Sequence, residues 1–419
     1  MIGWQDVRRE PFRLFFPLGV LLGLIGVGHW LGYATGVAAA ASGFFHAWMQ
    51  VGGFLTCIIV GFLLTALPRF AAATPSTTLE LLVLLSLAAA QPILLSLGRW
   101  MAAEWCFIAI LVGVAVFAGR RFAKRKASTG PPTEFVWVGI AIVHGVLGAL
   151  LLIGGQAGRL PASALIAGRQ MVQQGFVLSV ILGVGGFLAP RLMGRGLASV
   201  MATASARQVK RLRLRRALLH LFAGAWLLWS FWLEGQGAVR LAYLLRAAVV
   251  TAELAWTTQF LLPPIPPRIA EGYVRLLWAS LWALVLGLWG AALWPRYRVG
   301  WLHVTFIGGF TLMVFSVATM VVLSHGGQPH RLRQPLWILR VVAAGVLSAV
   351  ITRVMAPYDP AHFFLLVGIS AACWISAAGS WLAFALPVIL RPADPEAFER
   401  LHERVKREPA RDASRRHPA

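Results

Sequence analysis

Apolar stretches of about twenty residues recur along the whole chain, separated by short polar, basic or proline-rich segments. Because roughly twenty apolar residues in a helix cross the hydrocarbon of a bilayer, each stretch predicts one transmembrane helix. About twelve spans are predicted, at residues 14–36, 44–67, 79–98, 101–119, 135–157, 171–190, 217–234, 238–262, 272–294, 300–324, 335–356 and 362–390. The expected fold is all-α, a polytopic transmembrane bundle over residues 1–390, followed by a charged cytoplasmic tail at 391–419.

Composition supports this class of protein. Of the 419 residues, 58% are hydrophobic and only 13% are charged, yet the formal net charge is +23. In a soluble protein that charge would suggest a nucleic-acid partner, but here the basic residues lie in the breaks between apolar stretches. We therefore expect a lipid bilayer as the partner, and no nucleic acid.

The placement of lysine and arginine predicts the orientation. If the N-terminus is inside, most of the 38 basic residues fall in cytoplasmic segments, including the linkers "GRRFAKRKASTGPPTE" and "RQVKRLRLRR". The first apolar stretch is longer than the core of a signal peptide and is interpreted as a retained span. We expect a multi-pass membrane protein with both termini in the cytoplasm.

Four histidines fall near the same predicted face. His46, His303 and His362 begin the second, tenth and twelfth spans at the periplasmic side, and His29 lies near the periplasmic exit of the first. Each of them, taken alone, is better explained as a polar ring packed at the interface. Four imidazoles at one level also fit a ligand site, because neutral histidine is a common ligand for metals and haem.

His325 stands apart from this group. It follows His303 by 22 residues on one predicted helix, which is roughly 33 Å at 1.5 Å per residue, a full membrane thickness. It belongs to the cytoplasmic rim together with His330, with His220 as a candidate neighbour. The alternative is that "HGGQPHRLR" is a solvated loop.

Other polar residues inside the spans are few. Arg246 and Glu253 are seven residues apart on the eighth span and share a helix face, so they either pair with each other or line a proton path. A mutual pair needs fewer assumptions. His144, midway along the fifth span, is predicted to satisfy a buried hydrogen bond.

Several segments together resemble the NnrS family of polytopic bacterial membrane proteins. They are "EPFRLFFPLG" at the N-terminus, "FHAWMQVGGF" followed by "VGFLLTALPRF", "GVGGFLAPRLMGRG" in mid-chain and "LHVTFIGGFTLMVFSVATMVVLSHGGQP" in the tenth span. The resemblance covers nearly the whole chain. It implies a protein that contains haem and copper and is associated with denitrification and resistance to nitric oxide.

The chain departs from the family pattern in two motifs. Where the family begins its second span with His-Ala-His-Glu, this chain has His46 and Ala47 followed by Trp48 and Met49. In the tenth span Met320 replaces an arginine, and "SHGGQ" replaces a Gly-His-Thr-Gly-Arg turn. This member is therefore expected to bind one metal fewer, although Met49 shares a helix face with His46 and its thioether could act as a soft ligand.

The resemblance and the shared face together give the expected site. The candidates for holding a cofactor are His46, His303, His325 and Arg353, and the candidate metal ligands are His46, His303, His29 and Met49. Arg353, Arg296 or Arg298 would pair with haem propionates. Haem is the expected cofactor, with copper as a second candidate.

The expected function is nitric-oxide or nitrosative-stress tolerance through bound haem, with nitric oxide as the gaseous ligand and an electron donor that the sequence does not identify. We find no general acid–base pair on the periplasmic side, so the sequence leaves open whether the protein is an enzyme. One alternative is a twelve-helix transporter without a redox cofactor, against which stands the lack of a sequence repeat between the two halves. The other is a redox enzyme resembling the haem-copper oxidases, against which stands the lack of a tandem histidine pair in any span.

Overall fold

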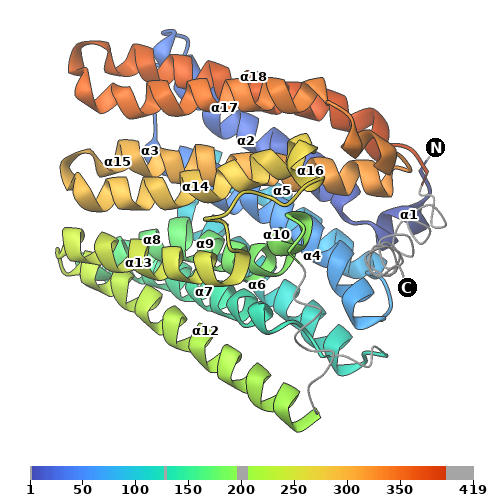
Figure 1. Cartoon of the computed structure of the whole chain (residues 1–419). Helices are drawn as coiled ribbons and strands as arrows, with labels where there is room; N and C mark the ends of the chain where they lie inside the picture. The colour runs from blue at the N-terminus through green and yellow to red at the C-terminus, as the bar shows by residue number, and fades with distance from the viewer. Residues whose placement is uncertain (1, 127–129, 196–205, 393–419) are drawn as a thin grey trace.

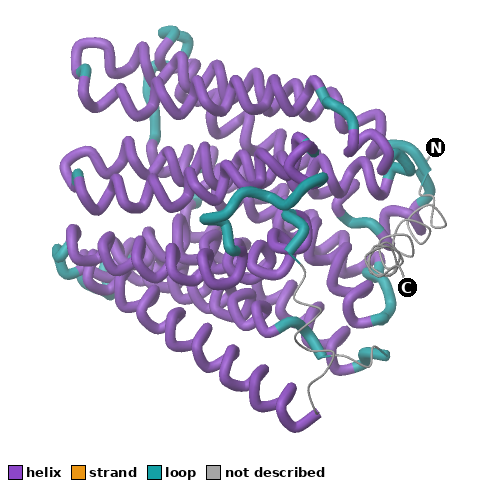
Figure 2. Tube along the Cα trace, viewed as in Figure 1, coloured by secondary structure: helices purple, strands orange, loops and turns teal. Residues whose placement is uncertain are grey.

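The computed structural model describes residues 2–126, 130–195 and 206–392, and these contain helices and loops but no strand (Figure 2). The all-helical prediction is confirmed. From residue 393 onward, the predicted charged tail lies outside the described residues.

Eleven helices of the described chain are long and apolar enough to cross a membrane. The remaining predicted span, 238–262, is present as helix α13 (Val239–Thr258). This helix is not among the eleven, and its charged residues Arg246 and Glu253 lower its mean hydropathy. The predicted spans are thus all helices of one bundle.

The long helices form three successive units of four. The first unit, residues 12–123, contains α2 (Phe12–Ala34), a second helix built of α3 (Gly43–Trp48), η1 (Met49–Leu55) and α4 (Thr56–Ala71), then α5 (Thr78–Ser96) and α6 (Trp100–Ala123). The second unit, residues 136–258, contains α7 (Val136–Gln156), a second helix built of α8 (Ala162–Gln170), η3 (Met171–Phe176), α9 (Val177–Val180), η4 (Ile181–Gly185) and α10 (Gly186–Leu192), then α12 (Ala206–Gly235) and α13. The third unit, residues 272–389, contains α14 (Gly272–Leu293), a second helix built of α15 (Arg298–His303), η7 (Val304–Thr311) and α16 (Leu312–His325), then α17 (Trp337–Met355) and α18 (Phe363–Ile389).

Short elements complete the chain. Helix α1 (Trp4–Arg9) precedes the first unit, and 3₁₀ turns lie at η2 (Thr133–Phe135), η5 (Arg268–Ala270), η6 (Pro295–Tyr297), η8 (Pro329–Arg333), η9 (Ala356–Tyr358) and η10 (Pro360–His362). Helix α1 and the last turn of α18 lie at the same end of the bundle (Figure 1).

The three units close into a ring. Within each unit the first helix packs on the second and the third packs on the fourth. The fourth helix of each unit then packs on the first helix of the next, as α6 on α7, α13 on α14 and α18 on α2. The second helices occupy the centre, because 72% to 83% of the residues in their apolar cores are buried, against 56% or less in the other candidate spans.

A sequence repeat accompanies this threefold arrangement. Each second helix carries a Gly-Phe pair, which ends in Phe54, Phe176 and Phe310 in the three units. In the first two units a Pro-Arg pair begins fourteen residues after this phenylalanine and ends in Arg69 and Arg191. In the third unit a Ser-His pair, ending in His325, occupies the same position relative to Phe310. Comparing the first half of the chain with the second half misses this repeat, because the midpoint of the chain falls inside the second unit. The expectation of no internal repeat is therefore corrected.

The second helices share a departure from α-helical geometry. Each contains a π-helical stretch that includes its Gly-Phe pair: η1, η3 and η7. A π turn holds one residue more than an α turn, so it rotates the side chains that follow, and such stretches are frequent at functional sites. The three stretches therefore direct attention to the half of the bundle farther from α1.

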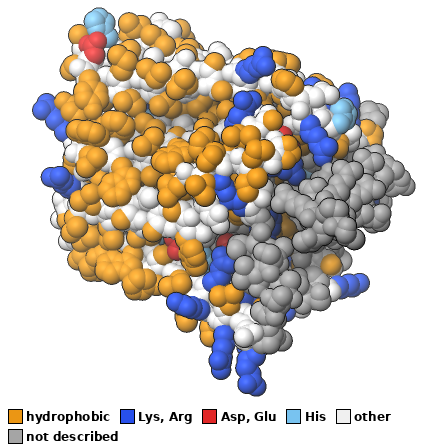
Figure 3. All heavy atoms as spheres, viewed as in Figure 1, with side chains coloured by type: hydrophobic (Ala, Val, Ile, Leu, Met, Phe, Trp, Pro, Cys, Tyr) orange, Lys and Arg blue, Asp and Glu red, His pale blue; other side chains and the backbone are white. Residues whose placement is uncertain are grey.

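Two predicted boundaries are corrected. The sixth span begins at Ala162 rather than 171, and the helix of the seventh already includes Ala206, the first residue described after 195, rather than beginning at 217. The segment "RQVKRLRLRR", predicted as a linker, is helical because lysine, arginine and leucine favour helix and the charges lie on an exposed extension. The surface agrees with a membrane protein: apolar side chains cover the flank of the bundle, and basic side chains concentrate toward the end that holds α1 (Figure 3).

Candidate cofactor-binding cavity

A cavity of about 430 Å³ lies between the second helices of the first and third units, in the half of the bundle farther from α1. Its polar wall contains two imidazoles, three guanidinium groups, three side-chain amides and two hydroxyl groups. Aromatic and aliphatic residues form the rest. The polar lining residues are His46, His303, Arg169, Arg298, Arg353, Gln50, Gln170, Gln173, Thr311 and Ser370.

The two imidazoles are held in the same way. Nδ1 of His46 lies 3.0 Å from the carbonyl oxygen of Gly26, and Nδ1 of His303 lies 2.6 Å from that of Val299. A carbonyl can only accept, so each ring carries its proton on Nδ1 and keeps a lone pair on Nε2. A histidine whose Nδ1 donates to a carbonyl is the usual arrangement in ligation through Nε2.

The two rings lie just before π-helical stretches. His46 lies three residues before η1, and His303 immediately precedes η7. His46 and Arg353 are both within electrostatic range of His303. The structure thus brings together three of the predicted site residues, from the first and third units.

The charge of the cavity is positive. Arg169, Arg298 and Arg353 line it, and none of the described residues in its wall is acidic. Gln50 is fixed by donating from Nε2 to the carbonyl oxygen of Gly23 at 2.9 Å. Three guanidinium groups with no acidic partner in the wall suit a ligand that carries anionic groups.

The other residues predicted at this face do not line the cavity. Nε2 of His29 accepts the backbone N–H of Ser42 at 2.5 Å. Met49 is fully buried against Gly26 of α2, where an added Cβ on that glycine would lie 2.5 Å from the Cβ of Met49. His362 is exposed and lies 2.9 Å from the Asp359 carboxylate.

His325 lies at the opposite end of the third unit's second helix, as predicted from spacing. Its Nδ1 is 2.7 Å from Oε1 of Glu10, which also binds Arg13 at 2.6 Å and Arg69 at 3.2 Å. Burial alone raises the pKa of Glu10, but the hydrogen bond and charge of His325, with the charge of Arg13, hold that pKa below its usual range. This Glu10 cluster joins the N-terminal segment to the ends of α4 and α16.

His220 belongs to another cluster. Its Nδ1 lies 3.0 Å from the Glu253 carboxylate, and the indole N–H of Trp137 donates to the same carboxylate at 3.3 Å. The expectation that His220 is a neighbour of His325 is therefore corrected: its described partners come from α7 and α13 of the second unit.

The predicted pair of Arg246 and Glu253 is wrong. Arg246 instead binds Glu234 of α12 at 2.8 Å and Oε1 of Gln174 at 2.7 Å, all fully or nearly buried. Helix α12 offers a partner to each of these two buried residues of α13: Glu234 binds Arg246, and His220 binds Glu253. Arg246 and Glu253 therefore do not need each other. The amide of Gln174 also donates to Gln170, which lines the cavity.

His144 has the buried hydrogen bond that was predicted for it. Its Nδ1 lies 3.0 Å from Oγ of Ser179, and its ring is 1% exposed. It packs against Phe231 and Gly175 in the second unit and does not line the cavity.

Among the described residues, no group of three or more His, Cys, Asp or Glu side chains is placed to hold a metal ion. The two cavity imidazoles thus form a pair, and a group bound there would supply its other ligands itself. A haem does so, since its four pyrrole nitrogens leave only the axial positions to the protein.

Sequence reasoning missed Arg169, and the repeat would have found it. His303 lies seven residues before Phe310, and Arg169 lies seven residues before Phe176. The second unit therefore places a guanidinium group on the cavity from the position where the third unit places an imidazole.

The fold and the cavity define a class: multi-pass helical membrane proteins with a histidine- and arginine-lined cavity between central helices. Within that class, the family model described as NnrS protein matches residues 6–393, so the chain belongs to the NnrS family. Among curated proteins, the comparison found no match to the chain.

Proposed function

We propose that this protein binds haem in the cavity and acts in nitric-oxide or nitrosative-stress tolerance linked to denitrification, in the bacterial inner membrane. Membership of the NnrS family fits a role in the nitric-oxide response. The observation that carries the proposal is the pair of imidazoles, each with Nδ1 bonded to a carbonyl and Nε2 left for ligation.

The donor set favours haem over a bare copper ion. A blue-copper site draws two histidines and a cysteine from the protein, whereas the cavity provides two imidazoles and no thiolate. The cavity volume lies within the range of small-molecule and cofactor sites, roughly 300 to 1,000 Å³. Copper remains the second candidate metal, to be decided by metal analysis.

The remaining walls suit a macrocycle with propionates. Phe54, Phe306 and Trp374 offer apolar faces, and Arg353 and Arg298 offer bidentate donors for carboxylates. Arg353 is in turn oriented by Phe363, whose ring centroid lies 5.9 Å from the guanidinium carbon. His46 and His303 would hold the iron through Nε2, and the arginines would pair with the propionates.

Bound haem would supply an iron that coordinates nitric oxide. The protein would hold the imidazoles in one tautomer, neutralise the propionates and keep bulk water from the apolar walls. Nitric oxide is apolar and would arrive from the bilayer that surrounds the bundle. An electron donor is a further expected partner if the gas is reduced.

Optical spectra and metal analysis of purified protein test the proposal. With haem supplied during expression, the wild-type protein is expected to show a Soret band. His46→Ala and His303→Ala are expected to shift or abolish that band per folded protein, because each removes a ligand. Two matched controls, His325→Ala at the far end and His362→Ala on the exposed 3₁₀ turn, should leave it unchanged.

Two outcomes contradict the proposal. A wild-type protein without a Soret band would exclude haem. Wild-type spectra in both His46→Ala and His303→Ala would exclude the cavity as the site, and loss of haem from His325→Ala alone would move the site to the Glu10 cluster.

A further inference from the structure

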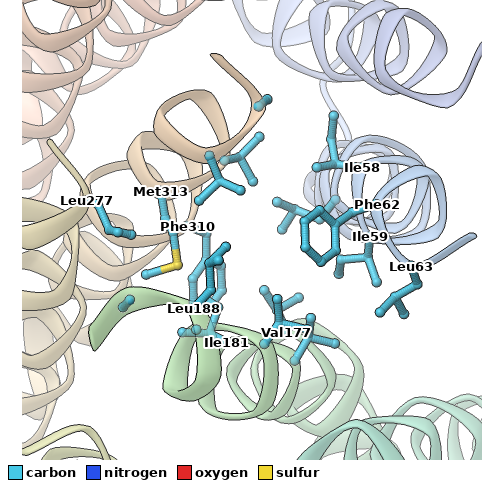
Figure 4. A pocket seen from close by; sticks show the side chains of 18 of the residues that line it. Ile58, Ile59, Phe62, Leu63, Val177, Ile181, Leu188, Leu277, Phe310 and Met313 are labelled. Carbon is cyan, nitrogen blue, oxygen red and sulfur yellow. The ribbon is translucent and has the colours of Figure 1, made fainter. Parts of the chain in front are cut away.

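A second, smaller cavity of about 100 Å³ lies where the second helices of all three units meet (Figure 4). Ile59 of α4, Val180 of α9 and Val317 of α16 each contribute one wall. Every described residue that lines it is apolar. We call it the central cavity, and the one described above the histidine cavity.

The two cavities share side chains. Leu55 and Phe310 line both of them, and both residues belong to the π-helical stretches that follow the cavity histidines. Both are almost fully buried, at 5% and 1% exposure. Their side chains therefore form a common wall between the central cavity and the histidine cavity.

An apolar void of this kind does not hold water well. Water in a cavity needs two to four polar partners, and an apolar cavity of roughly 150 Å³ stays dry and binds xenon or benzene. The central cavity, at about 100 Å³, is smaller still, so it suits a single small apolar molecule. Filling it would also recover the dispersion contacts that its lining atoms lack.

We propose that the central cavity is a binding site for an apolar diatomic gas, which passes between Leu55 and Phe310 to reach the histidine cavity. The gas site itself rests only on the shape and lining of the central cavity. Its identity as a store of nitric oxide rests on the proposed function. The central cavity, where the three second helices meet, thus stores the gas next to the cavity that holds His46 and His303.

Xenon is the probe for the gas site. Crystals of the wild-type protein pressurised with xenon are expected to show one xenon atom in the central cavity by anomalous scattering. Val317→Phe and Val180→Phe place a ring in the cavity from two different units and should abolish that peak. Val112→Phe, at a 47% exposed position on α6, is the control and should retain it.

A wild-type cavity without xenon, or one filled by a detergent or lipid chain, overturns the proposal. So does a xenon peak that survives in both filled variants. Two independent variants guard against one that does not fold, and folded protein is selected by gel filtration.

The path to the histidine cavity is tested separately with haem-loaded protein. The association rate of nitric oxide, followed after flash photolysis, is expected to fall several-fold in a filled variant, while the equilibrium affinity changes less than twofold. An unchanged rate in both filled variants overturns the path. A protein that binds xenon but no haem would refute the proposed function and leave the gas site supported.

Discussion

At the scale of single residues, one position explains how the central helices approach their neighbours. Five residues before each repeated phenylalanine, the second helix packs on a glycine of the first helix. The pairs are Met49 on Gly26, Met171 on Gly148 and Thr305 on Gly287. Met49 thus occupies a packing position common to the three units, and this accounts for its burial away from the histidine cavity.

Gly148→Ala tests this packing. An added Cβ would lie 2.9 Å from the carbonyl oxygen of Gly168 and 2.9 Å from the Cβ of Met171, so α7 and the second helix must move apart. We expect a loss of roughly 1 to 3 kcal/mol in the free energy of unfolding, measured in detergent.

Gly139→Ala on the same helix is the control, because nothing lies within 4 Å of its added Cβ. Alanine favours helix over glycine by about 1 kcal/mol, so this variant should be neutral or more stable. Equal losses in the two variants would contradict the packing argument.

His144 gives a second prediction at this scale. Because its ring bonds Ser179 and lies outside the histidine cavity, His144→Gln should lower the thermal unfolding temperature yet leave bound haem or copper per folded protein unchanged. A folded variant that has lost its cofactor would refute this separation of stability from binding.

At the scale of elements, α13 shows why a helix with two buried charged residues, Arg246 and Glu253, can lie within the bundle. Arg246 is fully buried and also lies over the rings of Phe231 and Tyr243, 4.2 and 4.4 Å from their centroids. An unpaired charge in a span is costly, so each buried charge on α13 requires a partner from a neighbouring helix. The interface of α12 and α13 supplies these partners.

Arg246→Met is expected to destabilise the protein by roughly 3 to 5 kcal/mol, because it leaves Glu234 buried without its guanidinium partner. The double variant Arg246→Met with Glu234→Met should recover much of that loss, since two apolar side chains can replace a buried pair. Arg240→Met, at an exposed position of the same helix, should change stability by about 0.5 kcal/mol or less. A double variant as unstable as the single one would show that the pair itself is not the cause.

At the scale of the whole molecule, the Glu10 cluster closes the ring of units. Arg13 donates to Glu10 and also to the carbonyl oxygens of Ile389 and Arg391, at 2.5 and 2.6 Å, and so fastens α18 to the start of α2. His325 and Arg69 tie the central helices of the third and first units to the same carboxylate. The segment "EPFR" thus connects the first unit to the last.

Glu10→Gln should destabilise the protein by roughly 3 kcal/mol at neutral pH. Because the pKa of Glu10 is lowered by folding, its contribution is complete above the ordinary glutamate pKa and is lost as the pH falls through the lowered value. Thermal unfolding of wild type and variant should therefore differ most at pH 7 and converge in acid. Asp359→Asn, in an exposed pair with His362, is the control and should have little effect at either pH.

The orientation is also a property of the whole molecule. The excess of basic residues in one set of loops predicts cytoplasmic termini. Alkaline phosphatase fused to the C-terminus should be inactive, and a cytoplasmic reporter fused there should be active. The reverse pattern would invert the bundle and place the histidine cavity at the cytoplasmic side.

The threefold ring also bears on the transporter alternative. Many secondary transporters are built from two repeats, with the substrate between them. This chain has three units of four helices in the same orientation, with an apolar cavity where they meet. This arrangement differs from that of a two-repeat transporter.

The sequence by itself determined the class, the spans, and the separation of His46 and His303 from His325, because hydrophobic length and rise per residue act locally along each helix. It also indicated that Arg353 belongs near the histidines. Partner choice was decided only by tertiary structure: Arg246 binds Glu234, Met49 packs on Gly26, and Arg169 joins the cavity from the second unit. These contacts depend on which helix faces meet, and the meeting is set by ring closure and by the π turns that rotate the central helices.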